Sequence, residues 1–319
     1  MKRIPLIGVL VVVAALPVTA HARELAPLVS VDWLASQSRA DDLVVLDIRS
    51  AIDDSDRETF EQGHIPGAVY SSYTDDGWRR EENGVPGKLP PVAELERLIG
   101  GLGIGNDDDV VIVPAGVGST DFGAATRVYW TFKVLGHDDV AILQRRPPCV
   151  GRGRPRARAR LERARQRPLR GGLPPRAAGH HSRRSSRARE AGVQLVDNRP
   201  AAQFRGAEKH PEARASGTIP GALNLQQGEL VRAGTAFVID PARLDALMEQ
   251  VGVRGDERTI TFCNTGHWAS IGWFVLSEVR GQENVAMYDG SMTAWSQDPG
   301  RPLQTARSGI GAVLDWLFN

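Results

Sequence analysis

Short apolar runs alternate with segments of helical character along most of this chain. Six runs have the length and composition of buried strands; they cover residues 43–47, 110–114, 139–143, 194–197, 258–262 and 284–288. Helical patterns lie between them, at residues 91–100, 121–135, 240–251 and 268–280. Such alternation is typical of an α/β fold with a mostly parallel sheet. In such folds the ligand binds outside the carboxyl ends of the strands.

The same pattern occurs twice, at a spacing of about 150 residues. Residues 43–49 (Leu-Val-Val-Leu-Asp-Ile-Arg) resemble residues 193–199, and residues 63–69 (Gly-His-Ile-Pro-Gly-Ala-Val) resemble residues 217–223. Residues 135–141 and 280–286 form a third such pair. We therefore expect two tandem copies of one α/β domain, each a mostly parallel sheet flanked by helices.

Length and composition are those of an ordinary globular protein. The chain has 319 residues, of which 41% are hydrophobic and 24% charged. These values exclude collagen-like, coiled-coil and wholly disordered chains. Two cysteines, Cys149 and Cys263, are too few for a disulfide-stapled scaffold or a zinc-ribbon array.

The first residues have the layout of a secretory signal peptide. Two basic residues precede an apolar run over residues 4–18, and the small-x-small sequence Ala20-His21-Ala22 follows. The run is shorter than the ~20 apolar residues that a spanning helix needs. We expect residues 1–22 to be cleaved and the mature protein to be exported, periplasmic if the cell is Gram-negative, without membrane attachment. An uncleaved membrane anchor is the alternative.

The net charge of +1 hides a strongly basic segment. Residues 144–190 hold sixteen arginines and two glutamates, and their apolar residues show no periodicity. Composition alone predicts disorder or nucleic-acid binding. Neither interleaved aromatic residues nor a binding fold supports nucleic-acid contact, so we expect no nucleic-acid partner.

The basic segment also replaces parts that the repeat requires. After residues 285–288 the second copy continues Asp-Gly-Ser-Met-Thr-Ala-Trp, whereas the first copy at this point continues Gln-Arg-Arg-Pro-Pro-Cys-Val. One back-translation of residues 144–151, read one base later, gives Asn-Gly-Gly-Leu-Pro-Ala-Trp-Val. We interpret residues 144–190 as the product of two compensating frame changes, in the gene or in its sequencing. Cys149 is then accidental and Cys263 has no disulfide partner; a genuine basic linker is the alternative.

Cys263 stands where an α/β fold binds its ligand. It follows the β-rich run 259–262 and opens the loop Asn264-Thr265-Gly266-His267-Trp268, which leads into a helix. Loop N–H groups can converge on an anion, and the helix N-terminus adds positive potential; both favour a reactive thiolate. Alternatively Cys263 is a small buried hydrophobe, and His267 packs rather than orienting a donor. No second Cys or His stands at ligand spacing, so no metal is expected.

The repeat, the LDxR and GxIPGA elements and the CNTGHWAS loop together resemble the tandem-domain rhodaneses over residues 30–143 and 191–303. This is the family of thiosulfate and 3-mercaptopyruvate sulfurtransferases. In that family the C-terminal domain carries the nucleophile and the N-terminal domain is an inactive copy. The matching place in the first copy reads Val113-Pro114-Ala115-Gly116-Val117-Gly118, without a cysteine and with a loop expected to be about three residues longer.

The resemblance implies an enzyme that moves a sulfane sulfur from a small donor, thiosulfate or 3-mercaptopyruvate, to a thiol or cyanide-like acceptor. The sulfur passes through a persulfide on Cys263, which the N–H groups of residues 264–268 cradle, with no metal or organic cofactor. A non-enzymatic sulfur carrier or binding module of this fold is the alternative. A phosphatase on the fold would need a C-x5-R loop, and residue 269 is Ala.

The resemblance also assigns roles near the cysteine. Asp197 and Arg199 match a structural pair at the end of the first strand of the active copy. Arg214 matches an arginine that binds the anionic donor. Gln203 stands where a second such arginine is expected, and CNTGHW departs from the usual loop sequences, so the donor's identity stays open.

These expectations divide the chain into five parts. They are a signal peptide (1–22), an inactive rhodanese-like domain (23–143), the basic segment (144–190), a catalytic domain (191–305) and a tail (306–319). The short amphipathic tail is expected to dock on the body of the protein. The oligomeric state is left open.

Overall fold

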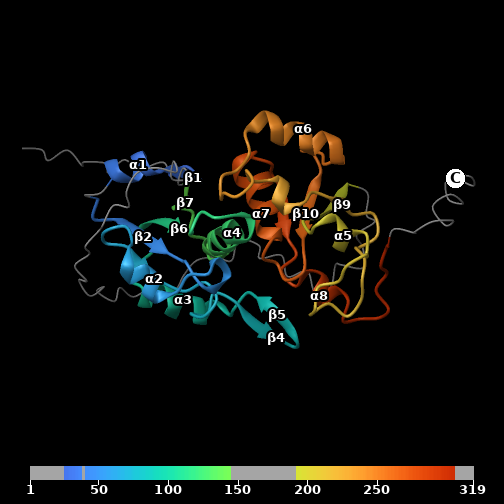
Figure 1. Cartoon of the computed structure of the whole chain (residues 1–319), viewed down its shortest axis with the longest axis horizontal. Helices are drawn as coiled ribbons and strands as arrows, with labels where there is room; N and C mark the ends of the chain where they lie inside the picture. The colour runs from blue at the N-terminus through green and yellow to red at the C-terminus, as the bar shows by residue number, and fades with distance from the viewer. Residues whose placement is uncertain (1–24, 38–39, 145–191, 306–319) are drawn as a thin grey trace, which may run out of the picture.

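The structure, a computed structural model, describes residues 25–37, 40–144 and 192–305. The expected signal peptide, the basic segment apart from Gln144, Cys149 and the tail lie outside the described residues. Two α/β units lie side by side in Figure 1. The first runs from blue to green and the second from yellow to red, and we call them the first and second copy.

The first copy is built on a five-stranded parallel sheet in the order β1-β7-β6-β2-β3. Its strands are β1 (Leu28–Ser30), β2 (Leu43–Asp47), β3 (Val69–Tyr70), β6 (Asp109–Val113) and β7 (Val140–Gln144). Its helices are α1 (Val31–Ser36), η1 (Ala51–Asp53), α2 (Arg57–Gln62), α3 (Val92–Gly101) and α4 (Ser119–Val134).

The second copy has a four-stranded parallel sheet in the order β11-β10-β8-β9. Its strands are β8 (Val193–Asp197), β9 (Leu223–Asn224), β10 (Arg258–Phe262) and β11 (Val285–Met287). Its helices are α5 (Ala201–Phe204), η3 (Gln227–Glu229), α6 (Pro241–Val251), α7 (Ala269–Phe274), the π-helical turn η4 (Val275–Val279) and α8 (Ser291–Trp295).

This architecture confirms the predicted fold class of two tandem α/β domains with mostly parallel sheets. The six expected strands are present with small shifts; the strand expected at 110–114, for example, is β6 at 109–113. The helix expected at 268–280 is α-helical only to Phe274 and continues as a π-helix. The pattern located these elements because parallel strands are buried on both faces and read as continuous apolar runs.

The two copies differ at the places that flank the basic segment. In the first copy, β1 and α1 precede β2, and β1 pairs with β7. No described strand of the second copy lies beyond β11. The second copy closes with α8 after β11, whereas the described part of the first copy ends with β7. Each copy therefore lacks, among its described residues, a part that the other has.

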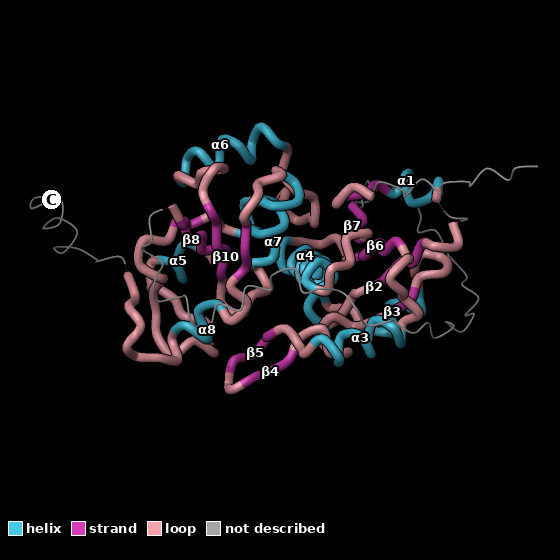
Figure 2. The backbone as a smooth tube through the Cα atoms, turned by 180° about the vertical axis from the view of Figure 1, so that it is seen from behind, coloured by secondary structure: helices cyan, strands magenta, loops and turns pink. Residues whose placement is uncertain are grey.

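Helix α4 of the first copy packs directly on α7 of the second, and Figure 2 shows it end-on between the two sheets. The rings of Phe122 and Tyr129 on α4 pack edge-on against Phe274, with centroids 5.8 and 4.9 Å apart. The hydroxyl oxygens of Thr126 and Ser270 are 2.7 Å apart. A common apolar core therefore spans both copies, which fixes the first copy beside the loop that follows β10.

An antiparallel hairpin of the first copy reaches the second. It consists of β4 (Arg80–Glu82) and β5 (Val85–Lys88), joined by Asn83 and Gly84 at φ values of 55° and 71°. The Gln297 side-chain amide donates to the Gly84 carbonyl over 2.9 Å, next to α8. The Asn-Gly turn is a strong hairpin signal, although the apolar periodicity did not single out these strands.

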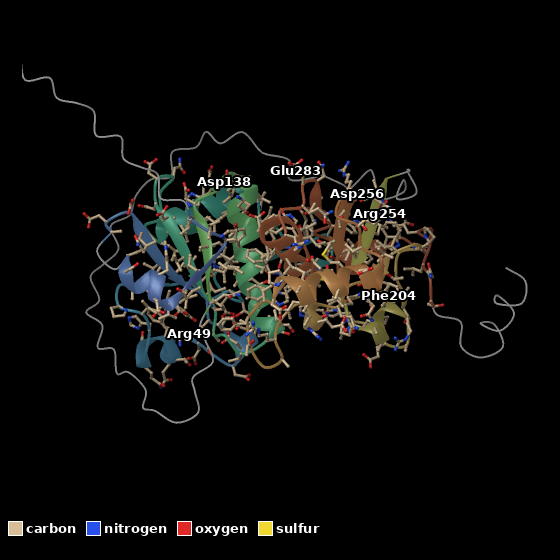
Figure 3. All side chains as sticks on the ribbon, turned by 90° about the horizontal axis from the view of Figure 1, so that it is seen from above. Arg49, Asp138, Phe204, Arg254, Asp256 and Glu283 are labelled. Atoms are coloured by element: carbon tan, nitrogen blue, oxygen red, sulfur yellow. The ribbon has the colours of Figure 1, made fainter. Side chains whose placement is uncertain are left out.

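The amino ends and the carboxyl ends of the strands lie on different sides of the molecule. In Figure 3, Asp138, Arg254, Asp256 and Glu283, which precede strands, lie along one side of the molecule. Arg49 and Phe204, which follow β2 and β8, lie toward the other side. The fold is expected to bind its ligand at the carboxyl ends of the strands, which is the side of Arg49 and Phe204. None of the helices in the described ranges is long and apolar enough to cross a bilayer.

Candidate active site

The strand register places Cys263 at the carboxyl end of β10, as the sequence predicted. Asp197 of β8 pairs with Phe262, and Asp47 of β2 pairs with Val113 in the same way. Pro114 therefore occupies in the first copy the position that Cys263 occupies in the second. The loop from residue 114 to α4 has five residues and the loop from Cys263 to α7 has six. The expectation of a longer loop in the first copy was therefore wrong.

Cys263 is 1% exposed and belongs to the apolar core, so burial alone also fits a packing cysteine. Its surroundings are nevertheless polar on one side. Its N–H donates to the Ser291 hydroxyl over 3.0 Å, and its Sγ lies 4.0 Å from that oxygen. Its carbonyl accepts from the N–H of Met292 over 3.0 Å. The cysteine is thus bound through its backbone to the start of α8.

Ser291 ties the two ends of the loop together. Its hydroxyl accepts from the N–H groups of Cys263 and Gly266, over 3.0 and 3.1 Å, and donates to the Tyr288 carbonyl over 2.8 Å. Ser291 has a φ of 48°, a left-handed conformation that non-glycine residues rarely adopt. Such backbone strain is typical of positions that a functional site requires.

The loop after Cys263 has five backbone N–H groups, and four of them are free, within the described ranges, to bind an acceptor. Among the described residues, the N–H groups of Asn264, Thr265, His267 and Trp268 have no hydrogen-bond acceptor. The Gly266 N–H is bound by Ser291 instead. Gly266 has a φ of 76°, and a Cβ there would lie 2.5 Å from Arg127 and 2.7 Å from the Asp289 carbonyl. Only glycine fits this close approach.

The His267 ring is bound by the first copy. Its Nε2 lies 2.9 Å from the Thr120 carbonyl, which only accepts, so Nε2 carries the proton. Nδ1 then accepts from the Tyr73 hydroxyl over 2.8 Å. Burial, together with the nearby Arg79 and Arg127, lowers the pKa of His267 to about 3. The ring is neutral and packed, which favours the packing alternative for the side chain and leaves its backbone N–H in the cradle.

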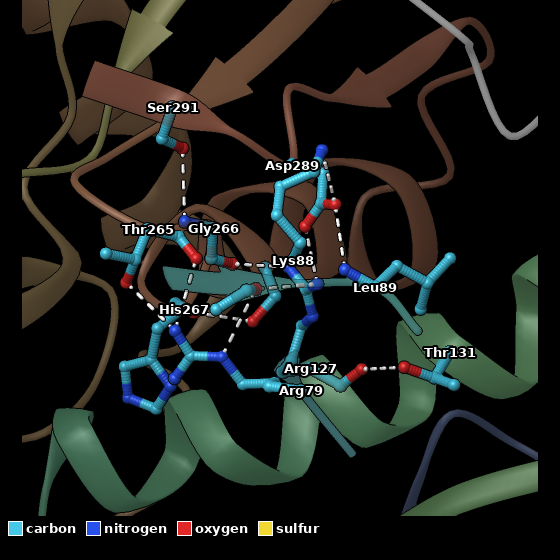
Figure 4. Close-up of polar contacts among 12 residues, drawn as sticks. Arg79, Lys88, Leu89, Arg127, Thr131, Thr265, Gly266, His267, Asp289 and Ser291 are labelled. Atoms are coloured by element: carbon cyan, nitrogen blue, oxygen red, sulfur yellow. Dashed lines mark hydrogen bonds and ion pairs between the residues drawn. The ribbon is translucent and has the colours of Figure 1, made fainter. Parts of the chain in front are cut away.

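Two arginines of the first copy contact the loop, and Figure 4 shows both side chains reaching it. Arg79 donates to the side-chain oxygen of Thr265 over 3.0 Å and to its carbonyl over 3.3 Å. Arg127, on α4, is fully buried and donates to the Gly266 carbonyl over 3.3 Å. These contacts bring positive charge to the carbonyl side of the loop.

Arg127 is paired with Asp289, over 2.5 Å. Lys88 approaches the same carboxylate to 3.0 Å, and the Leu89 N–H donates to it over 3.0 Å. Burial opposes ionisation of Asp289, but the positive charges of Arg127 and Lys88 hold its pKa below the ordinary value. The hairpin, α4 and the segment before α8 therefore meet in one ionic cluster beside the loop.

Asp197 and Arg199 form a buried pair that joins β8 to a neighbouring loop. The Arg199 guanidinium contacts both carboxylate oxygens of Asp197 and donates to the Gly217 carbonyl over 2.8 Å. The first copy repeats this arrangement with Asp47 and Arg49. The pair in the copy without the cysteine shows that its geometry does not depend on the candidate nucleophile.

Arg214 is exposed, and its backbone N–H donates to the Ser296 hydroxyl over 2.9 Å. Its guanidinium has no hydrogen bond or ion pair to any described residue. Gln203 accepts from the Asn264 side-chain amide over 2.8 Å. The two positions at which the sequence departs from the family pattern are therefore partners, and a neutral amide pair lies beside Cys263.

The equivalent loop of the first copy already holds a carboxylate. Asp121, 2% exposed, accepts from the N–H groups of Ala115, Gly116 and Val117 over 2.9, 2.6 and 3.0 Å. Counted from the helix start, the second copy has Ile271 at this place, which supplies no acceptor. The fold thus directs loop N–H groups toward a carboxylate in the first copy, whereas in the second copy such groups have no partner within the described ranges.

Sequence reasoning missed Tyr73, Arg79 and Arg127, and it placed Asp289 and Ser291 only in the segment that closes the second copy. A weak signal existed for Arg127, a charge between apolar residues on a helix that is buried over most of its length. The other contacts join residues up to about 200 positions apart and leave no local pattern. No group of three or more His, Cys, Asp or Glu side chains in the described ranges is placed to hold a metal ion.

Comparison with known proteins identifies the family of both copies. The rhodanese-like domain family matches residues 30–145 and 184–298. A protein of Haloferax volcanii, provisionally named a thiosulfate sulfurtransferase, is 31% identical over 293 residues, 87% of this chain and 96% of that protein. The sulfur carrier protein TtuD of Thermus thermophilus is 30% identical over 86% of this chain and 95% of its own length.

A solved structure shows the same fold. SseA of Escherichia coli, described as a 3-mercaptopyruvate sulfotransferase, superposes with a TM-score of 0.65 at 24% identity, over 83% of this chain and 98% of SseA. The family match covers both copies, and the site lies at the junction of β10 and α7 in the second. The chain therefore belongs to the rhodanese family and contains two rhodanese-like domains in tandem.

Proposed function

We propose that this protein is a sulfurtransferase that carries a sulfane sulfur as a persulfide on Cys263. The names of its relatives support sulfurtransferase chemistry in general terms. The observation that carries the proposal is the loop after Cys263, in which four N–H groups lack an acceptor among the described residues. A persulfide anion at the start of this loop would supply the missing acceptor.

The chemistry requires two displacements at sulfur. With thiosulfate, the Cys263 thiolate attacks the sulfane sulfur, the S–S bond of thiosulfate breaks, and sulfite leaves with the electron pair. With 3-mercaptopyruvate, the C–S bond breaks and the carbon takes up a proton to give pyruvate. A thiol or cyanide acceptor then attacks the outer sulfur of the persulfide, and the Cys263 thiolate returns. We propose Arg214, exposed and without a side-chain partner among the described residues, as the group that attracts the anionic donor.

The test is the intact mass of the protein after exposure to each donor. We expect a gain of one sulfur atom with thiosulfate or with 3-mercaptopyruvate, reversed by cyanide and absent in Cys263→Ser. Arg214→Gln should raise the donor concentration needed for half-loading and leave the maximal loading unchanged. The absence of any gain with either donor, in a protein with a cooperative thermal transition, would refute the enzymatic proposal.

A sulfur carrier without turnover is the second candidate. Two observations favour it: a relative with 30% identity is named a sulfur carrier protein, and the Gln203–Asn264 amide pair stands beside the cysteine. Turnover with excess acceptor separates the two. An enzyme releases many equivalents of transferred sulfur per Cys263, whereas a carrier stops at one equivalent until a partner protein removes the sulfur.

We further propose that the protein is exported after cleavage behind Ala22. The basic start, the apolar run over residues 4–18 and the Ala-His-Ala sequence support this. Expression of the full chain in a Gram-negative host, followed by fractionation, should give a periplasmic protein whose first residue is Arg23. A protein that retains residues 1–22 or stays in the cytoplasm would contradict it.

A further inference from the structure

The first copy lacks the cysteine but holds the loop that surrounds it. Arg79 donates to the Thr265 carbonyl and Arg127 to the Gly266 carbonyl, each over 3.3 Å. Both arginines are bound in turn to the Gly87 carbonyl of the hairpin. The two guanidinium groups therefore connect consecutive peptide groups of the loop to the same point of the first copy.

Because a peptide group is planar, a contact that fixes its carbonyl also fixes the direction of its N–H. In a trans peptide the carbonyl of one residue and the N–H of the next point in opposite directions. The peptide between Thr265 and Gly266 is held at both ends, by Arg79 at its oxygen and by Ser291 at its N–H. The next peptide is held by Arg127 at the Gly266 oxygen, which directs the His267 N–H to the opposite side. That N–H has no acceptor among the described residues.

The same residues place an excess of positive charge at the loop. Arg79, Arg127 and Lys88 carry three positive charges, and Asp289 is the one carboxylate that these described side chains bind closely. Arg127 is fully buried, so water screens its charge poorly. The Nε–H of Arg127 is buried and has no hydrogen-bond partner within the described ranges, so part of its hydrogen-bonding capacity is unused.

We propose that Arg127 is a positioning residue for Cys263: from the copy that lacks a cysteine, it directs the His267 N–H toward the sulfur anion, while Arg79 fixes the preceding peptide, whose N–H binds Ser291. The proposal rests on the proposed function of Cys263. On this view the first copy is a working part of the active site, since its arginines set the geometry and the charge of the cradle. Neither arginine touches the reacting sulfur.

The test measures the reactivity of Cys263 against pH, with iodoacetamide and mass spectrometry of the Cys263 peptide. We expect Arg127→Met to move the midpoint of the alkylation curve upward by about one pH unit and, at pH values below that midpoint, to slow persulfide formation up to about tenfold. The KM for the donor should change much less than kcat. Arg127→Lys keeps the positive charge but lacks the planar set of N–H donors of a guanidinium, so it should restore the midpoint in part.

Arg80→Met is the matched control, since Arg80 is adjacent to Arg79 but pairs with Glu82 and Glu94 on the surface. It should leave the alkylation curve and kcat unchanged. If Arg127→Met does not fold, Arg79→Met decides, because Arg79 is only partly buried. An unchanged midpoint in folded Arg127→Met or Arg79→Met overturns the proposal. Alkylation needs no sulfur donor, so a shifted midpoint in a protein that never accepts sulfur would refute the proposed function alone.

Discussion

The Nδ1 atom of His267 lies 2.8 Å from the hydroxyl oxygen of Tyr73, so the loop that follows Cys263 is bound to the copy that has no cysteine. The other ring nitrogen, Nε2, donates to the Thr120 carbonyl. A Cβ on Gly123 would lie 2.7 Å from that nitrogen, which shows how closely α4 approaches the ring. The conformation of the loop at the candidate site therefore depends on the packing of the first copy against the second.

The first prediction concerns acid stability. Burial lowers the pKa of His267 to about 3, below the value of 6.5 in an unfolded chain. Below pH 6.5 the unfolded state therefore binds a proton that the native state does not bind, and the free energy of unfolding decreases as the pH falls. When the pH falls from 7 to 5, the free energy of unfolding should decrease by about 2 kcal/mol less in His267→Gln than in the wild type. Urea unfolding at both pH values measures this difference, and an equal loss in the two proteins would contradict the prediction.

The second prediction concerns Asp121, whose titration acts in the opposite direction. Burial raises its pKa to about 6, although three N–H groups favour the carboxylate. The native state then binds a proton more readily than the unfolded chain, so this group favours folding more at pH 5 than at pH 7. When the pH falls from 7 to 5, the free energy of unfolding of the wild type should rise by about 1 kcal/mol relative to that of Asp121→Asn. A pH-independent difference between the two proteins would contradict the burial of a titrating carboxyl.

The third prediction uses an anion to replace the Asp121 side chain. Asp121→Ala leaves three N–H groups of the loop without their acceptor, which should cost about 2–3 kcal/mol. Millimolar sulfate should return part of the lost thermal stability in this variant and change the wild type little. Sodium chloride at equal ionic strength is the control. Equal responses to the two salts would mean that the loop does not bind a free anion.

The fourth prediction concerns Ser291. Ser291→Ala removes the acceptor of two buried N–H groups and should destabilise the protein by about 1–3 kcal/mol. It should also slow persulfide formation, because the Gly266 peptide is no longer held. Ser291→Gly removes the same hydroxyl but suits the φ of 48°, so it should unfold at a higher temperature than Ser291→Ala. Thermal unfolding and donor-loading rates measure both effects.

The fifth prediction concerns the basic segment. Resequencing of the gene decides whether the frame of residues 144–190 is genuine. A chain with the frame restored should gain a closing element in the first copy and an opening element in the second, because each described copy lacks what the other has. Restored and unrestored chains, compared by thermal unfolding, should differ by several degrees in favour of the restored chain. Equal midpoints would support a genuine linker.

Much of each domain could be predicted because its signal is local. The run Thr259–Phe262 ends at a cysteine, and Gly266 follows within the loop, so the strand, the turn and the candidate nucleophile are adjacent in the chain. The position of β6 was missed by one residue, since nothing in the apolar pattern fixes a strand end more closely. The hairpin β4–β5 escaped the periodicity because its two strands are short and mostly polar, although Asn83-Gly84 marks its turn.

By itself, then, the sequence determined the two α/β repeats, the positions of six of their strands along the chain and the place of Cys263 at a strand end. It did so because burial on both faces of a sheet leaves a continuous apolar run that neighbouring residues alone define. Only the tertiary structure decided what surrounds the cysteine: Arg79 and Arg127 at its loop, His267 neutral against Tyr73, and Ser291 beneath it. The arginine and tyrosine contacts join the two copies, and Ser291 is 28 positions from Cys263; contacts between residues so far apart leave no periodic trace in a single chain.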